Sequence, residues 1–348
     1  MNSQWSGVAG SALTVCVALV VGLASGKAGG QSADAADDNP VPTTVSAEAQ
    51  NYLRNLRLPP GRAMNYADPA VMTRLRGGLG KMFLLTARRI RTDYTLDPVD
   101  LNGVPGLWVR TPDPVRKGKV LLYLHGGGYI LGSPATDLAL PLRIGPAAGI
   151  AVLSAGYRLA PEHPYPAAVD DALTAYRWLL KQGYRGRDIG VFGDSAGGGL
   201  TLALALAVRD ARLPSPAALV ALSPVTDMTG AGDTRQTLKD SDPILRGDAT
   251  VRRSAYVGEH DPRDPLISPI YADLRGLPPL LIQVGTREVL LSDSVRFARR
   301  AREAGVEVTL DVWEGMWHVF QGNPDVPEAK QASDEIADFL RRRVTGKR

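Results

Sequence analysis

The chain contains 348 residues, of which 44% are hydrophobic and 22% charged. This balance is typical of a globular protein with a large core, and α/β folds of this length often form one domain. The formal net charge is only +4, and no stripe of Lys or Arg alternates with stacking aromatics, so we expect no nucleic-acid partner. The single cysteine, Cys16, excludes an internal disulfide and a thiolate metal site.

Residues 1–28 are predicted to form a signal peptide or an N-terminal membrane anchor. The run 7–26 carries no charge, and about 20 apolar residues suffice to cross a bilayer as a helix. Small residues at Ala24 and Gly26, or at Ala33 and Ala35, offer cleavage sites, although no Lys or Arg precedes the apolar run. Residues 29–44 are predicted to be a disordered linker. We therefore expect the protein to be exported (secreted or periplasmic) or anchored in a membrane.

Residues 45–348 are predicted to form one α/β domain. Helical spacing of apolar residues covers 45–91, with a break at 59–61. Further along, the predicted strands are 106–110, 120–124, 150–154, 189–192, 218–222, 280–284 and 306–312, and the predicted helices are 167–181, 196–209, 293–304 and 328–343. This alternation indicates a mostly parallel sheet flanked by helices. Segments 45–91 and 228–262 are predicted to form a helical cap over the site.

Three consecutive glycines between His125 and Tyr129 follow a predicted strand. Glycine leaves backbone N–H groups uncovered, so such a loop can point them at a substrate oxygen and form half of an oxyanion hole. We assign donors to Gly126 and Gly127, with a third from the N–H of Ala196. His125 is expected to hold the loop through a backbone hydrogen bond. A merely flexible loop is the alternative, and a phosphate site is disfavoured because no Lys-Ser/Thr pair follows.

The sequence Gly193-Asp194-Ser195-Ala196-Gly197 matches the pattern G-x-S-x-G. It follows a predicted strand and opens a predicted apolar helix, which is the setting that a nucleophile elbow requires. The start of a helix also places free N–H groups beside the developing oxyanion. The alternative is an ordinary glycine-rich turn in which Ser195 caps the helix. We predict that Ser195 is the nucleophile.

The base and the acid of a triad follow the serine in this motif order, with the histidine last. Of four histidines, His318 is the one that fits, because it lies after the last predicted strand, whereas His260 falls in the predicted cap. The acid should follow the strand 280–284, where Glu288 and Asp293 are the candidates. Glu288 is nearer the strand end and is favoured, while Asp293 is expected to cap the next helix. Either carboxylate could orient the imidazole.

Together these motifs resemble the hormone-sensitive-lipase family of esterases. The resemblance is carried by residues 125–129, 157–168 and 193–198 and spans about 45–343. It implies an α/β-hydrolase fold with a helical cap and a cofactor-free esterase that acts on small-molecule esters with short to medium acyl chains. The family usually has Asp where this chain has Glu288.

The expected function is therefore that of a serine carboxylesterase working through an acyl-enzyme. One alternative is a ligand-binding protein on the same fold without catalysis. Another keeps the triad but acts on a different substrate, as an amidase, lactonase or lipase. No cluster of ligands has the spacing of a metal site, so no metal is expected.

Overall fold

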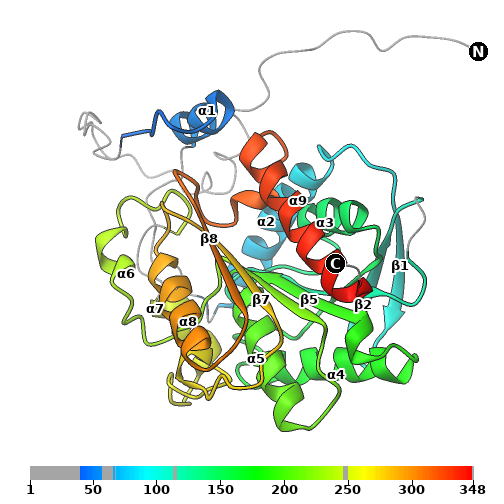
Figure 1. Cartoon of the computed structure of the whole chain (residues 1–348). Helices are drawn as coiled ribbons and strands as arrows, with labels where there is room; N and C mark the ends of the chain where they lie inside the picture. The colour runs from blue at the N-terminus through cyan, green and yellow to red at the C-terminus, as the bar shows by residue number, and fades with distance from the viewer. Residues whose placement is uncertain (1–39, 57–65, 67, 113–115, 246–249, 347–348) are drawn as a thin grey trace, which may run out of the picture.

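The computed structural model describes residues 40–56, 66, 68–112, 116–245 and 250–346. Within this part of the chain, the centre is an eight-stranded sheet in the order β1-β2-β4-β3-β5-β6-β7-β8 (Figure 1). The strands are β1 (Thr95–Asp100), β2 (Pro105–Arg110), β3 (Val120–Leu124), β4 (Val152–Ala155), β5 (Ile189–Asp194), β6 (Ala218–Leu222), β7 (Leu280–Gly285) and β8 (Val308–Trp313). The helices are α1 (Ala47–Asn55), α2 (Pro69–Ala87), α3 (Ala139–Ala148), α4 (Ala167–Lys181), α5 (Ala196–Asp210), α6 (Thr234–Thr237), α7 (Thr250–Val257), α8 (Leu291–Glu303) and α9 (Pro327–Thr345), with short 3-10 helices η2 (Gly186–Asp188), η3 (Pro269–Tyr271) and η4 (Phe320–Gly322).

Strands β3 to β8 pair in parallel, whereas β1 and β2 are antiparallel at one edge of the sheet. Every residue of β3, β5 and β6 is buried. Strands covered on both faces need no polar side, which explains their continuous apolar sequences. The predicted fold class, a mostly parallel sheet flanked by helices, is confirmed.

Alternate residues of each strand enter two different cores. Leu122 belongs to the core that includes residues of α4, α5 and α8, and its neighbour Leu121 to the core that includes residues of α3 and α9. In Figure 1, α9 crosses one face of the sheet and α5 and α8 lie on the other. Burying one such leucine is worth about 1.5–3 kcal/mol, so the two layers hold the strand ends firmly in place.

Both predicted cap segments contact loops at the carboxyl ends of the strands. In segment 45–91, the ring of Tyr52 in α1 stacks on Trp317, with ring centroids 4.4 Å apart. In segment 228–262, Tyr256 of α7 stacks on Tyr129, with centroids 3.7 Å apart. These contacts place the two segments against the loops that follow β8 and β3.

One strand and one α-helix were not predicted from the sequence. Strand β1 is exposed at five of its six residues, so it buries no alternating face that its sequence could reveal. Helix α3 contains Gly145 and Pro146, which are both unfavourable inside a helix. A side chain at Gly145 would come within 2.8 Å of Val152, so close packing on the sheet requires glycine there.

The predicted segment 1–28 and most of the predicted linker 29–44 lie outside the described residues. Residues 40–44 are described, and they contact the domain: Val41 packs against the core around Trp317, and Arg287 Nη1 donates to the carbonyl of Pro40 over 3.1 Å. The domain therefore includes Pro40, and the predicted boundary at residue 45 is too late. Among the described helices, none has the length and hydrophobicity needed to cross a bilayer.

Candidate active site

Ser195 lies at the sharp turn between β5 and α5. Its backbone has φ 55° and ψ −119°, a conformation that is strained for any residue except glycine. A Cβ atom on Gly193 would lie 2.3 Å from the carbonyl oxygen of Gly197, and one on Gly197 only 2.0 Å from that of Leu124. The glycines of the motif are therefore required by close backbone approach. The turn is fixed by the Ser195 N–H, which donates to the Leu222 carbonyl over 2.7 Å.

The structure brings together the serine, histidine and glutamate that the sequence analysis singled out. His318 Nε2 lies 2.9 Å from Ser195 Oγ, and His318 Nδ1 lies 2.9 Å from Glu288 Oε2. The three residues follow β5, β8 and β7 respectively. Glu288 is fully buried and His318 is 7% exposed, so both hydrogen bonds are largely shielded from water. This is the geometry that a serine nucleophile, a base and an orienting acid require.

The carboxylate of Glu288 is held by two further donors. Its Oε1 accepts hydrogen bonds from Ser223 Oγ (2.9 Å) and from the N–H of Gly285 (2.6 Å). Oε2 is thereby turned toward His318, so Nδ1 carries the proton and Nε2 is the acceptor for the Ser195 hydroxyl. Sequence reasoning missed Ser223, whose only signal was its place directly after a predicted strand.

Asp293, the other candidate acid, makes different contacts. Its Oδ2 accepts the N–H groups of Thr226 (3.0 Å) and Asp227 (3.1 Å), and Arg235 forms an ion pair with it at 3.1 Å. Burial raises the pKa of Asp293, although Arg235 opposes this shift. The N-cap of α8 is Leu290, so the expectation that Asp293 caps this helix is wrong. Geometry leaves Glu288 as the carboxylate that faces the histidine.

The electrostatic surroundings favour a basic imidazole. Burial alone would lower the pKa of His318, but the hydrogen bond and charge of Glu288, with the charges of Asp242 and Asp194, raise it above its ordinary value. Asp194 is buried as well, and this burial raises its pKa to about 6. Negative charge around a histidine stabilises its imidazolium form.

The glycine loop after β3 departs from the prediction in one respect. The N–H of Gly126 donates to Asp194 Oδ1 over 3.1 Å, so it does not point at a substrate oxygen. This contact contradicts the assignment of Gly126 as an oxyanion donor. Within the described residues, the N–H groups of Gly127, Gly128 and Ala196 have no hydrogen-bond acceptor. Gly127 and Gly128 have φ of 106° and 65°, which glycine adopts readily.

His125 supports this loop from within. Its Nδ1 lies 2.8 Å from the carbonyl oxygen of Gly126, as expected from the sequence. Its ring stacks on Tyr157 at 4.3 Å between centroids, and the Tyr157 hydroxyl donates to the His125 carbonyl over 2.6 Å. Burial lowers the pKa of His125, which keeps the ring neutral and suited to this packing role.

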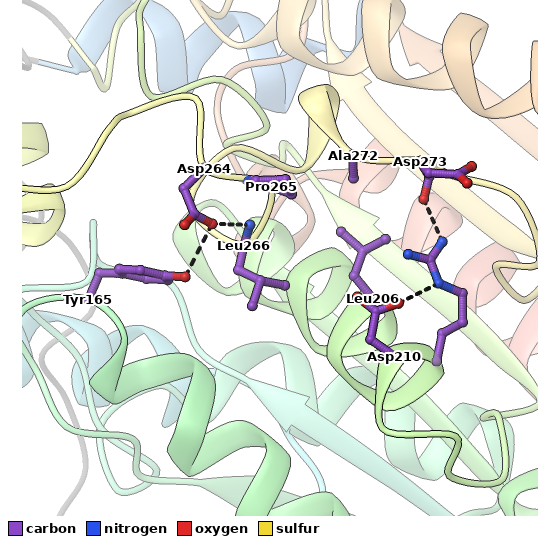
Figure 2. A pocket seen from close by; sticks show the side chains of 9 residues that line it. Tyr165, Leu206, Asp210, Asp264, Pro265, Leu266, Ala272 and Asp273 are labelled. Carbon is purple, nitrogen blue, oxygen red and sulfur yellow. Dashed lines mark hydrogen bonds and ion pairs between the residues drawn. The ribbon is translucent and has the colours of Figure 1, made fainter.

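A separate pocket, shown in Figure 2, contains none of the residues named above as the candidate site. It lies beside the end of α5, where Asp264 Oδ1 accepts hydrogen bonds from the Tyr165 hydroxyl (3.1 Å) and the Leu266 N–H (2.8 Å). No group of metal-ligating side chains occurs in the described ranges of the chain.

A strained serine at the carboxyl edge of a mostly parallel sheet, in line with a histidine and an acid, defines the α/β-hydrolase class. Residues 121–322 match a family model described as the alpha/beta hydrolase fold. The chain is 46% identical over 249 residues to an acetyl-hydrolase from Streptomyces hygroscopicus, covering 70% of this chain and 82% of that protein. It is 38% identical over 245 residues to an esterase from Acinetobacter venetianus, covering 70% and 80%.

A solved structure of an esterase from the bacterial hormone-sensitive lipase family superposes with a TM-score of 0.78 at 40% identity. The match covers 86% of this chain and 99% of that one. The chain therefore belongs to the hormone-sensitive-lipase family of α/β-hydrolase esterases, and it is a carboxylic ester hydrolase.

Proposed function

We propose that the protein hydrolyses small-molecule esters with short to medium acyl chains, through an acyl-enzyme on Ser195. The observation that carries the proposal is the pair of 2.9 Å hydrogen bonds that join Ser195, His318 and Glu288 in series. The similarity to a protein named acetyl-hydrolase supports a short acyl group.

In the first half of the reaction, Ser195 Oγ attacks the ester carbonyl carbon while His318 Nε2 takes the hydroxyl proton. Glu288 keeps the imidazole in the required tautomer and stabilises its cation without taking the proton. The tetrahedral intermediate then collapses, and the alcohol leaves with the proton from His318. In the second half, His318 removes a proton from water as the water oxygen attacks the acyl carbon. The bond to Ser195 Oγ then breaks, His318 returns the proton to Oγ, and the carboxylic acid leaves.

We assign the N–H groups of Gly127, Gly128 and Ala196 as the donors that stabilise the negatively charged oxygen of the intermediate. These amides have no acceptor among the described residues, and Ala196 begins α5, where the helix dipole favours an anion. Removing one donor from such a site typically costs about 10²–10³ in kcat. Gly126 supports the loop through Asp194 and does not bind substrate.

The test is hydrolysis of p-nitrophenyl esters from acetyl to palmitoyl by the purified protein, its Ser195→Ala variant and a Ser215→Ala control. Ser215 is exposed in the loop before β6, away from the candidate site. We expect turnover of the acetyl and butyryl esters, unchanged in the control and reduced about 10⁶-fold in Ser195→Ala. Folded protein that turns over no ester would refute the proposal and favour a binding protein on the same fold.

We further propose that residues 1–28 export the protein or anchor it in a membrane, on the basis of the uncharged run 7–26. Fractionation of cells expressing the full chain should recover it outside the cytoplasm or in membranes. Recovery of the full chain with cytoplasmic marker proteins would refute this part.

A further inference from the structure

The backbone of the residue that follows the proposed catalytic acid is held by segment 228–262. The N–H of Val289, the residue after Glu288, donates to Asp242 Oδ2 over 2.9 Å. The carbonyl oxygen of Val289 accepts the hydroxyl hydrogen of Thr234 over 2.8 Å. Both backbone groups of one residue are thus bound by side chains about 50 positions earlier in the sequence.

These two side chains are themselves fixed. Asp242 is fully buried, and its Oδ1 accepts the N–H groups of Ile244 and Leu245, each over 2.8 Å. Thr234 and Ser292 form a reciprocal pair, in which the N–H of each residue donates to the hydroxyl of the other over 2.9 Å. Neither Asp242 nor Thr234 can rotate away from Val289 without breaking bonds of its own.

The length of the Glu288 side chain explains why the contacts of Asp242 and Thr234 to Val289 matter in this chain. A glutamate has one more rotatable bond than an aspartate, so its carboxylate position depends strongly on where its backbone lies. Ser223 and Gly285 fix the carboxylate end, and the contacts to Val289 fix the backbone end. A displacement of about 1 Å in a catalytic group can cost about 10²-fold in rate.

We propose that Asp242 and Thr234 are positioning residues for the Glu288–His318 pair, so that segment 228–262 supports the catalytic acid as well as contacting the oxyanion loop. This inference rests on the proposed function. Thr234 acts through geometry alone, whereas Asp242 also acts through its charge.

The charge of Asp242 makes its role separable from simple folding. Three carboxylates act on His318: Glu288 from the loop after β7, Asp242 from segment 228–262, and Asp194 from the end of β5. Each of them raises the pKa of His318. Removing one charge should therefore move the protonation of the free enzyme's base to lower pH, which a loss of packing would not do.

The experiment compares Asp242→Asn, Thr234→Ala and Thr234→Ser in the full chain, using p-nitrophenyl butyrate across pH. Asparagine offers one acceptor oxygen, so it cannot satisfy the Val289 amide and the Ile244 and Leu245 amides as the carboxylate does. Asp264→Asn is the matched control, because Asp264 also accepts the N–H of its own turn but contacts no residue of the acid loop (Figure 2).

We expect Asp242→Asn to lower kcat about 10–100-fold with little change in KM, and to shift the acidic limb of kcat/KM to lower pH. Thr234→Ala should lower kcat and move that limb less than Asp242→Asn does, because it displaces Glu288 without removing a charge, and Thr234→Ser should restore activity because it keeps the hydroxyl. Asp264→Asn should resemble the wild type. Proton NMR of the His318 Nδ1–H provides a readout that needs no turnover, and its resonance should move in Asp242→Asn and in Thr234→Ala but not in Asp264→Asn.

Titration of the active sites with a fluorophosphonate measures the concentration of folded enzyme, and each kcat is corrected with it. If the corrected kcat, the acidic limb and the NMR resonance of Asp242→Asn equal those of the wild type, the positioning role is overturned. That outcome leaves wild-type hydrolysis intact and is distinct from failure of the proposed function, in which the wild type itself turns over no ester.

Discussion

Ser223 donates its hydroxyl hydrogen to Oε1 of Glu288 over 2.9 Å, inside a fully buried environment. The same hydroxyl oxygen accepts the N–H of Val319, the residue after His318, over 3.2 Å. Ser223 follows β6 with φ 44°, an uncommon backbone conformation for serine. One side chain therefore connects the loop of the acid with the loop of the base.

Replacing Ser223 by alanine should weaken catalysis without unfolding the protein. The variant removes a hydrogen bond to a charged group, worth about 1.5–3 kcal/mol, and frees the Glu288 carboxylate to turn. We expect kcat to fall about 10–100-fold while KM changes little. Steady-state kinetics beside the Ser215→Ala control checks this; equal kcat in the two variants would rule out a role for Ser223 in catalysis.

The two carboxylates that compete for the role of acid can be separated by amide substitution. Glu288→Gln should lower kcat by about 10⁴, because a neutral amide no longer enforces the tautomer of His318. Asp293→Asn should leave kcat nearly unchanged but destabilise the fold by about 3–5 kcal/mol, since it breaks a buried pair with Arg235. Kinetics and thermal unfolding of both variants measure this, and the reverse pattern would make Asp293 the acid.

Gly126→Ala should disturb the oxyanion loop from a position that does not itself donate to substrate. Its Cβ would lie 2.2 Å from Asp194 Oδ2, so the loop or the carboxylate must shift. We expect kcat to fall about 10²–10³-fold, the cost of displacing an oxyanion donor. The control is Gly77→Ala in α2, where a Cβ meets nothing within 4 Å and alanine favours the helix. Similar kcat in both variants would contradict the loop's assigned role.

Asp194 should make folding stability depend on pH in a defined direction. Burial raises its pKa to about 6 in the folded protein, so between about pH 4 and pH 6 the folded state binds more protons than the unfolded state. Its contribution to stability is therefore present below about pH 4 and is lost as the pH rises through 6. The contribution of Asp194 to the free energy of unfolding should differ by about 3 kcal/mol between these two pH ranges, at about 1.4 kcal/mol for each pKa unit.

Urea unfolding of the wild type and Asp194→Asn at several pH values measures this contribution together with its coupling to His318, whose pKa the charge of Asp194 raises. The stability of the asparagine variant relative to the wild type should rise from about pH 4 to about pH 6 and then level off. A relative stability that stays constant with pH would show that Asp194 titrates alike in the folded and unfolded chain.

Elements that follow from a local sequence pattern were predicted, whereas elements that depend on distant contacts were missed. Strands β3 and β6 were predicted with their observed bounds because both their faces are buried and their sequences are continuously apolar. Strand β1 was missed because its exposed, antiparallel edge position imposes no such pattern. Helix α3 was missed because contacts with the sheet outweigh the unfavourable Gly145 and Pro146.

The sequence by itself determined the class of fold, the elbow around Ser195 and the choice of His318, because these depend on apolar runs and on glycines that close backbone approach demands. Only the tertiary structure decided that Glu288 rather than Asp293 faces the histidine, and that the amide of Gly126 donates its hydrogen bond to Asp194. Such choices depend on which donor and acceptor meet when loops far apart in sequence converge, and no local pattern encodes that pairing.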